Sequence, residues 1–154
     1  MNLNKENGIT IIALIITIIL MLILAGVGMH FGSDAVSKAK IEDIKEKMIS
    51  INIRAKIIAE KHNAKEIENL VGTKFEDATG FNKNNLNSVF SGFTGEQKDS
   101  LYIWTQEDLN NQGLNTIKVD TDNFYVINYN MDDFEIYYSK GIEGKFSLSE
   151  LNVE

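Results

Sequence analysis

Apolar residues run without a formal charge from residue 9 to residue 31. Only Thr10, Thr17 and His30 in this run are clearly polar. As a helix the run would rise about 34 Å, which matches a hydrocarbon core about 30 Å thick. The pattern therefore predicts a transmembrane helix over residues 9–31. A cleaved signal peptide and a helix that packs protein against protein are the alternatives.

The pattern changes between residues 32 and 63, where apolar positions recur every three to five residues and charged residues fill the positions between them. The apolar positions are Val36, Ile41, Ile44, Met48, Ile51, Ala55 and Ile58. This spacing predicts an amphipathic continuation of the same helix. We expect its apolar stripe to pack on the rest of the chain, with a coiled coil to another chain as the alternative.

The first part of residues 64–154 lacks a long periodic segment. Residues 64–71 are expected to form a helix that ends at Gly72. Residues 72–100 are rich in Gly, Asn, Ser and Thr and predict a long irregular connection. Four dispersed phenylalanines should hold this connection to a core: Phe75, Phe81, Phe90 and Phe93.

The second part of residues 64–154 predicts a small antiparallel sheet. Residues 101–104 (LYIW) predict a strand, and a short helix follows with Thr105 as N-cap, Asp108 as its capping partner and Gly113 near its end. Residues 124–129 and 134–138 are β-rich and flank a turn at 130–133, which predicts a hairpin. The tail is expected to add an edge strand or a short closing turn.

These elements predict an α+β fold, in which a long N-terminal helix, transmembrane in its first half, packs on a small antiparallel β-sheet head. The predicted divisions are a leader at 1–8, a transmembrane helix at 9–31, its amphipathic continuation at 32–63 and a head at 64–154.

Charge is spread unevenly over these divisions. The chain carries a net charge of −7, and residues 64–154 alone hold seven basic and sixteen acidic side chains. Such a head would repel phosphate backbones, so we expect no direct nucleic-acid binding. The sequence has no cysteine, which excludes disulfides, zinc–thiolate sites and thiol catalysis.

Residues 5–27, KENGITIIALIITIILMLILAGV, resemble the N-terminal signature of type IV pilins and type II secretion pseudopilins, in the variant that reads GITLIALV. The resemblance implies that a prepilin peptidase cuts after Gly8, so that the mature chain starts at Ile9 with an N-terminal amine that is often methylated. It also implies a single-pass membrane protein with a pilin-like head outside. By the positive-inside rule alone, the lysines that follow the apolar run would place the head inside. A bitopic anchor with Gly8 by coincidence is the alternative.

The chain departs from the pilin pattern at Ala13, where most members of the family carry Glu. In the family that carboxylate is thought to pair with a neighbour's N-terminus, and a buried carboxylate costs several kcal/mol unless it is paired. Ala13 therefore favours a minor or tip subunit at least as much as a major one. Gly26 and Gly28 resemble the region where pilin helices loosen in filaments, and close packing against another helix is the alternative.

No catalytic constellation is present in the sequence. His30 and His62 lie too far apart on one helix to share a metal, and there is no phosphate loop or nucleophile elbow. Trp104 and the five tyrosines are expected in the core or on the sheet. One acidic cluster is a candidate calcium site, although its spacing fits no EF-hand and solvated turns are the favoured interpretation. It comprises Asp120, Asp122, Asp132 and Asp133.

We therefore predict a membrane-anchored structural subunit, a minor pilin or pseudopilin of a type IV pilus or type II secretion-like filament, and not an enzyme. Its expected partners are the prepilin peptidase, other pilin or pseudopilin subunits and the membrane, with no required cofactor. The alternative is a bitopic membrane protein that does not polymerise and whose head binds a ligand or a partner.

Overall fold

The structure is a computed structural model that describes residues 11–152, with the side chains of 24–35 outside the description. The chain divides into two compact units, Met1–Lys40 and Ile41–Glu154. Helix α1 (Ile11–Asn63) contributes to both units and is continuous over 53 residues. Together with an antiparallel five-stranded sheet it confirms the predicted α+β class.

The sheet of the second unit is a simple antiparallel meander in the order β1-β2-β3-β4-β5. Its strands are β1 (Thr73–Lys74), β2 (Leu101–Ile103), β3 (Tyr125–Asn128), β4 (Glu135–Ile142) and β5 (Lys145–Ser147). Strands β3 and β4 form the predicted hairpin, and the 3-10 turn η2 (Met131–Asp133) lies where the turn was expected. Strand β2 confirms the strand predicted from LYIW.

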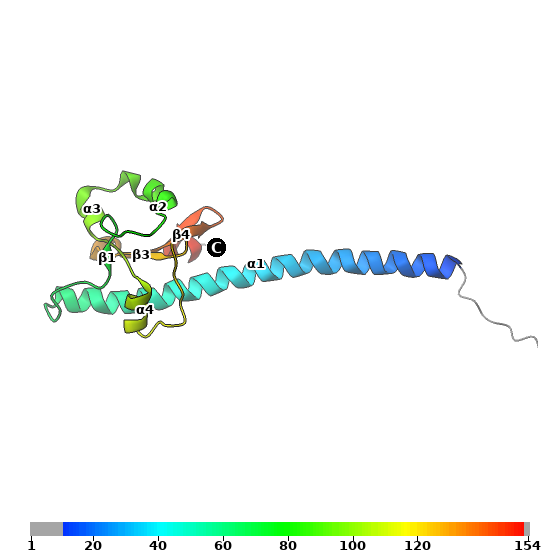
Figure 1. Cartoon of the computed structure of the whole chain (residues 1–154), viewed down its shortest axis with the longest axis horizontal. Coiled ribbons are helices and arrows are strands. Elements are labelled where there is room, and N and C mark those ends of the chain that lie inside the picture. The colour runs from blue at the N-terminus through cyan, green and yellow to red at the C-terminus, as the bar shows by residue number, and fades with distance from the viewer. Residues whose placement is uncertain (1–10, 153–154) are drawn as a thin grey trace, which may run out of the picture. The chain divides into compact units, whose positions relative to one another are not determined.

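Successive residues of a strand point to opposite faces of the sheet. Side chains on both faces are buried here. On the face toward α1, Ile127 and Ile136 join the same core cluster as Met48 and Ile51 of the helix. On the other face, Phe124 and Val126 join a second cluster. Figure 1 shows the sheet between the later part of α1 and the layer that contains α2 and α3.

The predicted apolar stripe of α1 packs on the sheet in its second half. Met48, Ile51, Ala55 and Ile58 are all buried in the core cluster, and Ile44 packs against it half-buried. Val36 is 55% exposed and takes no part in this core. The expected packing of the stripe on the rest of the chain is therefore confirmed for its later residues.

The segment between β1 and β2 is more regular than predicted. It contains α2 (Asn84–Val89), the 3-10 turn η1 (Phe90–Gly92) and α3 (Gly95–Asp99). These elements are too short to leave a helical periodicity in the sequence. The phenylalanines nevertheless hold the segment as expected, since Phe75 and Phe90 are buried and Phe81 and Phe93 pack half-buried against the same cluster.

The helix predicted over residues 64–71 is wrong. Helix α1 ends at Asn63, and Lys65 adopts a positive φ of 59°. The Lys65 amide donates to the His62 carbonyl at 3.0 Å, and the Glu66 amide donates to the Lys61 carbonyl at 2.9 Å. This pair of bonds is a Schellman motif, which reverses the chain and prevents a helix from starting directly afterwards.

The predicted cap of the next helix is confirmed. In α4 (Gln106–Asn111) the Thr105 hydroxyl accepts the Asp108 amide, and the Asp108 carboxylate accepts the Thr105 amide at 2.8 Å. Gly113, with a φ of 76°, follows the end of this helix as predicted. The tail forms the edge strand β5, one of the two alternatives expected for it, and then the short helix α5 (Leu148–Asn152), which was not predicted.

Candidate functional site

The start of α1 exposes an uninterrupted apolar surface. Every large apolar side chain from residue 11 to residue 23 is at least half exposed, from 50% at Ile15 to 76% at Ile11. Because the apolar residues are consecutive, they lie on all sides of the helix. Exposed apolar surface of this extent is typical of segments that another molecule covers.

The predicted processing and assembly residues fall partly outside the described residues. Gly8 and Ile9 lie outside them, so the cleavage site remains a prediction. Ala13 lies in α1, and its carbonyl accepts a hydrogen bond of 2.7 Å from the Thr17 hydroxyl, the local bond expected of a threonine in an apolar helix. Gly26 and Gly28 also lie within α1, whose helical backbone is unbroken there.

The transmembrane prediction covered residues 9–31, of which the structure describes the side chains of 11–23. Within the described part of the chain, no helix combines the length and the apolar character needed to cross a membrane.

Two of the four candidate calcium ligands accept hydrogen bonds from neighbouring groups, and the other two lie in a turn. Asp120 Oδ1 accepts the amides of Asp122 and Asn123 at 3.0 and 2.9 Å, and Asp122 accepts the Asn82 side-chain amide at 2.9 Å. Asp132 and Asp133 lie in the turn η2. Among the described residues, no three acidic, histidine or cysteine side chains are placed to hold a metal ion.

A pocket of about 250 Å³ lies on the face of the sheet away from α1. Phe75, Phe90 and Leu101 form its apolar part, and all three are buried in the second core cluster. The two aromatic rings meet edge to face, with their centroids 5.2 Å apart. The rest of the lining is polar and consists of Glu76, Lys83, Asn87 and Lys98.

The basic side of this pocket is fixed by contacts with its own wall. Lys83 Nζ donates to the carbonyl of Phe75 and, at 3.3 Å, to the carbonyl of Glu76. The same ammonium lies 5.1 Å from the centre of the Phe75 ring, within the range of a cation–π contact. Lys83 is therefore positioned over the apolar part of the pocket, and is not free to extend into solvent.

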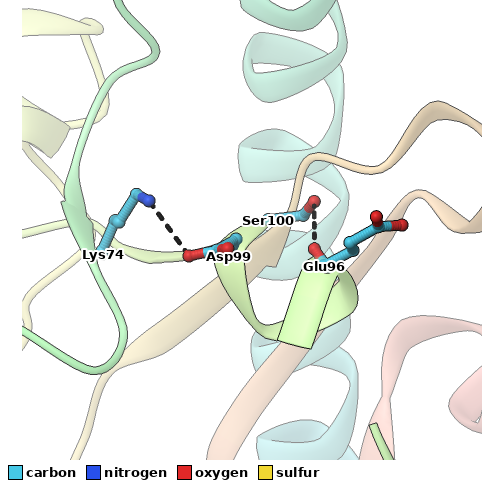
Figure 2. A network of polar contacts seen from close by, with 4 residues as sticks. All are labelled: Lys74, Glu96, Asp99 and Ser100. Carbon is cyan, nitrogen blue, oxygen red and sulfur yellow. Dashed lines mark hydrogen bonds and ion pairs between the residues drawn. The ribbon is translucent and has the colours of Figure 1, made fainter. Parts of the chain in front are cut away.

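Helix α3 contributes Lys98 to the lining of this pocket. Figure 2 shows the ion pair between Lys74 of β1 and Asp99 of α3, at 3.1 Å, and the bond from the Ser100 hydroxyl to the Glu96 carbonyl. The Asp99 carboxylate raises the pKa of Lys74 above its usual value. The ion pair joins β1 to α3, the helix that bears Lys98, although an exposed pair of this kind adds little to stability.

A buried polar network, not predicted from the sequence, lies in the core cluster on the α1 face of the sheet. Trp104 Nε1 donates to Tyr129 Oη and to the Val71 carbonyl, both at 3.0 Å, and the Tyr129 hydroxyl donates to the same carbonyl at 3.1 Å. Burial raises the pKa of Tyr129. Next to this network Gly72 has a φ of 105°, and a Cβ there would lie 2.8 Å from the Ile103 carbonyl oxygen.

Comparison with known proteins gives no match: no family model, no curated protein and no solved structure is similar to the chain.

Proposed function

We propose that the chain is a pilin-like structural subunit, a minor pilin or pseudopilin of a type IV pilus or type II secretion-like filament. The observation that carries the proposal is the apolar segment 11–23 of α1, whose large side chains are all at least half exposed. The same helix supplies one wall of the core of the second unit. A folded unit with such an exposed helical extension is suited to joining an assembly.

The mechanism we propose is mechanical and involves no catalysis. A lipid bilayer covers the apolar segment before assembly, with the sheet-bearing unit outside the cell. On assembly, the equivalent helices of neighbouring subunits replace the lipid. The free-energy change of this exchange is modest, because lipid tails and apolar side chains are similarly apolar surroundings for a helix. Close packing and polar contacts between the helices then determine their association.

Ala13 determines the kind of subunit we propose. A homopolymer of this chain would place every N-terminal amine in apolar surroundings without a carboxylate at position 13, at a cost of several kcal/mol each. In a mixed filament the amine of this chain can pair with the Glu of a neighbouring pilin. We therefore propose a low-copy subunit, with its place at the tip of the filament.

The test is the intact mass of the protein purified from its native host. The proposal predicts a chain that begins at Ile9, with the mass of one methyl group added where the amine is methylated. Gly8→Ala should reduce the processed fraction, whereas Asn7→Ala, which leaves the cleaved bond unchanged, should not. A mature chain that retains Met1, or that begins after Gly28, contradicts the proposal.

The second candidate function is a bitopic protein whose head binds a ligand without polymerising, and the observation that favours it is the pocket beside Phe75. Quantitative proteomics of sheared surface filaments distinguishes the two functions. A pilin-like subunit is present in the filaments at a low copy number relative to pilins that carry Glu, and a bitopic protein remains with the membrane fraction.

A further inference from the structure

Helix α1 carries a second apolar row in its later part, outside the core of the second unit. Ile49, Ile53 and Ile57 follow one another at intervals of four residues and are 41%, 55% and 41% exposed. Ile53 lies two residues from both Ile51 and Ala55, which are fully buried, so at about 3.6 residues per turn it points away from the sheet. Isoleucine favours a helix less than lysine or glutamate, and a row of three on an exposed face is typical of a contact surface.

The N-terminal end of this row adjoins an acidic pocket of about 340 Å³ between α1 and residues 114–117. The charged residues of its lining are Asp43, Glu46 and Lys47. Lys47 forms an ion pair with Asp43, so its positive charge is already compensated. The Glu46 carboxylate forms no ion pair with any of the described residues, which leaves the pocket one negative charge in excess.

The C-terminal end of the row adjoins a second acidic pocket, of about 470 Å³, between α1 and the turn η2. Its lining contains three carboxylates, those of Glu60, Asp132 and Asp133, and one ammonium, that of Lys56. The Lys56 ammonium lies 5.6 Å from the centre of the Phe134 ring, within the range of a cation–π contact. Within the part of the chain that the structure describes, none of the three carboxylates forms an ion pair. This pocket therefore also has a negative charge in excess.

We propose that this face of α1 binds a helix of a different protein, in which apolar residues are flanked by a lysine or an arginine near each end. The apolar residues of that helix cover Ile49, Ile53 and Ile57, and its two basic side chains enter the acidic pockets at Glu46 and Glu60. These two glutamates are fourteen positions apart on α1, about 21 Å along the helix axis, so the basic residues of the partner helix have a similar spacing. Rows of side chains four residues apart pack into the grooves of a second helix.

A second copy of this chain fits the same face poorly. If two copies cross at Ile53, an antiparallel pair places Glu46 near Glu60 of the other copy, and a parallel pair places identical carboxylates together. Both arrangements bring like charges together, which is unfavourable. Anionic lipid headgroups would meet the same carboxylates. The surface lies within the second unit, and its use does not depend on whether the chain assembles into filaments.

The probe for the test is a synthetic helical peptide with a stripe of leucines between two arginines fourteen positions apart. It is titrated into the full chain in an uncharged detergent and followed by amide chemical shifts. We expect saturable shifts at residues 46–60 with a dissociation constant on the order of 0.1 mM, because the contact is much smaller than a standard interface. A peptide with glutamates in place of both arginines should bind at least about fivefold more weakly, because its charges are repelled.

Charge reversal locates the two ends of the contact. The double variant Glu46→Lys with Glu60→Lys should reverse the preference, so that the glutamate peptide binds more tightly than the arginine peptide. The control is Glu76→Lys with Glu96→Lys, which changes the net charge equally at two exposed positions outside both pockets. This control should retain the preference for the arginine peptide.

A further variant tests the apolar row. Ile53→Gln should weaken binding of the arginine peptide at least about fivefold, since it removes apolar area at the centre of the contact. Val36→Gln, at a position of the same helix that is also 55% exposed, is the matched control and should leave the affinity unchanged.

Four results would each overturn the proposal. The first three are equal affinity of the two peptides for the unaltered chain, an unchanged preference in the variant of Glu46 and Glu60, and full affinity in the Ile53 variant. The fourth is a set of shifts at residues 46–60 that depends on protein concentration without peptide, because it would show that a second copy occupies this face.

Discussion

Residues 11–23 and residues 41–63 both belong to α1, yet their apolar side chains meet different surroundings. In the later segment Met48, Ile51 and Ala55 are fully buried, because a stripe on one side of the helix faces the sheet. In the earlier segment apolar residues are consecutive and all the large ones are at least half exposed. The chain's own fold thus covers the later positions of the periodic stripe and leaves the large apolar side chains of residues 11–23 exposed.

The largest expected effect contrasts one aspartate in each segment. Ile51→Asp places a charge in the core and should cost about 4 kcal/mol of unfolding free energy or more. Ile16→Asp, at a position 52% exposed, should leave the melting temperature of the sheet-bearing unit unchanged. Fluorescence of Trp104, the only tryptophan, reports the unfolding of this unit, because its indole is buried there. Equal loss in the two variants would contradict the comparison.

A smaller effect concerns glycines of the second unit. Gly72→Ala should cost about 3 kcal/mol, because the φ of 105° is strained for alanine and the new Cβ would lie 2.8 Å from both the Ile103 oxygen and the Trp104 ring. Gly80→Ala shares a positive φ but has nothing within 4 Å, so about 1 kcal/mol is expected. Thermal melts of the two variants separate the clash from the backbone strain. Similar losses in both would show that the contact at Gly72 is unimportant.

The smallest effect is a pH dependence in the second unit, which residues 11–23 cannot share because they carry no ionisable side chain. The Glu150 carboxylate accepts the amides of Ser147 and Phe146, which lowers its pKa below the usual 4.5. A carboxyl group whose pKa is lowered on folding stabilises the fold at pH values above its unfolded-state pKa. This contribution is lost as the pH falls through the folded-state pKa.

Urea titrations at several pH values test this contribution. Glu150→Gln should be slightly less stable than the unaltered chain at pH 6, and the difference should shrink as the pH falls from about 5 to about 3. A difference that stays constant over this range would mean that the charge of Glu150 has no part in the stability of the β5–α5 region.

Local signals in the sequence predicted much of the fold. The hairpin of β3 and β4 was visible as two β-rich runs around a polar turn, and the capping box of Thr105 and Asp108 was visible from its spacing. The absence of a helix after α1 was not visible, because Lys65 adopts the left-handed conformation that usually indicates a glycine. A propensity argument therefore wrongly placed a separate short helix over residues 64–71.

The candidate pocket was not predictable for a different reason. Lys83 and Lys98 are separated by fifteen positions, and their placement on one pocket depends on how α2 and α3 pack over the sheet. The bonds that join Trp104, Tyr129 and Val71 are likewise long-range. The available signal was indirect: four phenylalanines in a polar segment predicted a core there, without specifying which polar residues would surround it.

The central claim is that other molecules cover residues 11–23 in the cell. The chain has no cysteine, so a single introduced cysteine can be labelled selectively. The measurement is the rate at which a water-soluble maleimide labels Ile16→Cys in intact host cells, relative to Met131→Cys, since both positions are about half exposed in the isolated chain. The account predicts that position 16 is protected and position 131 reacts. Equal labelling at the two positions would contradict it.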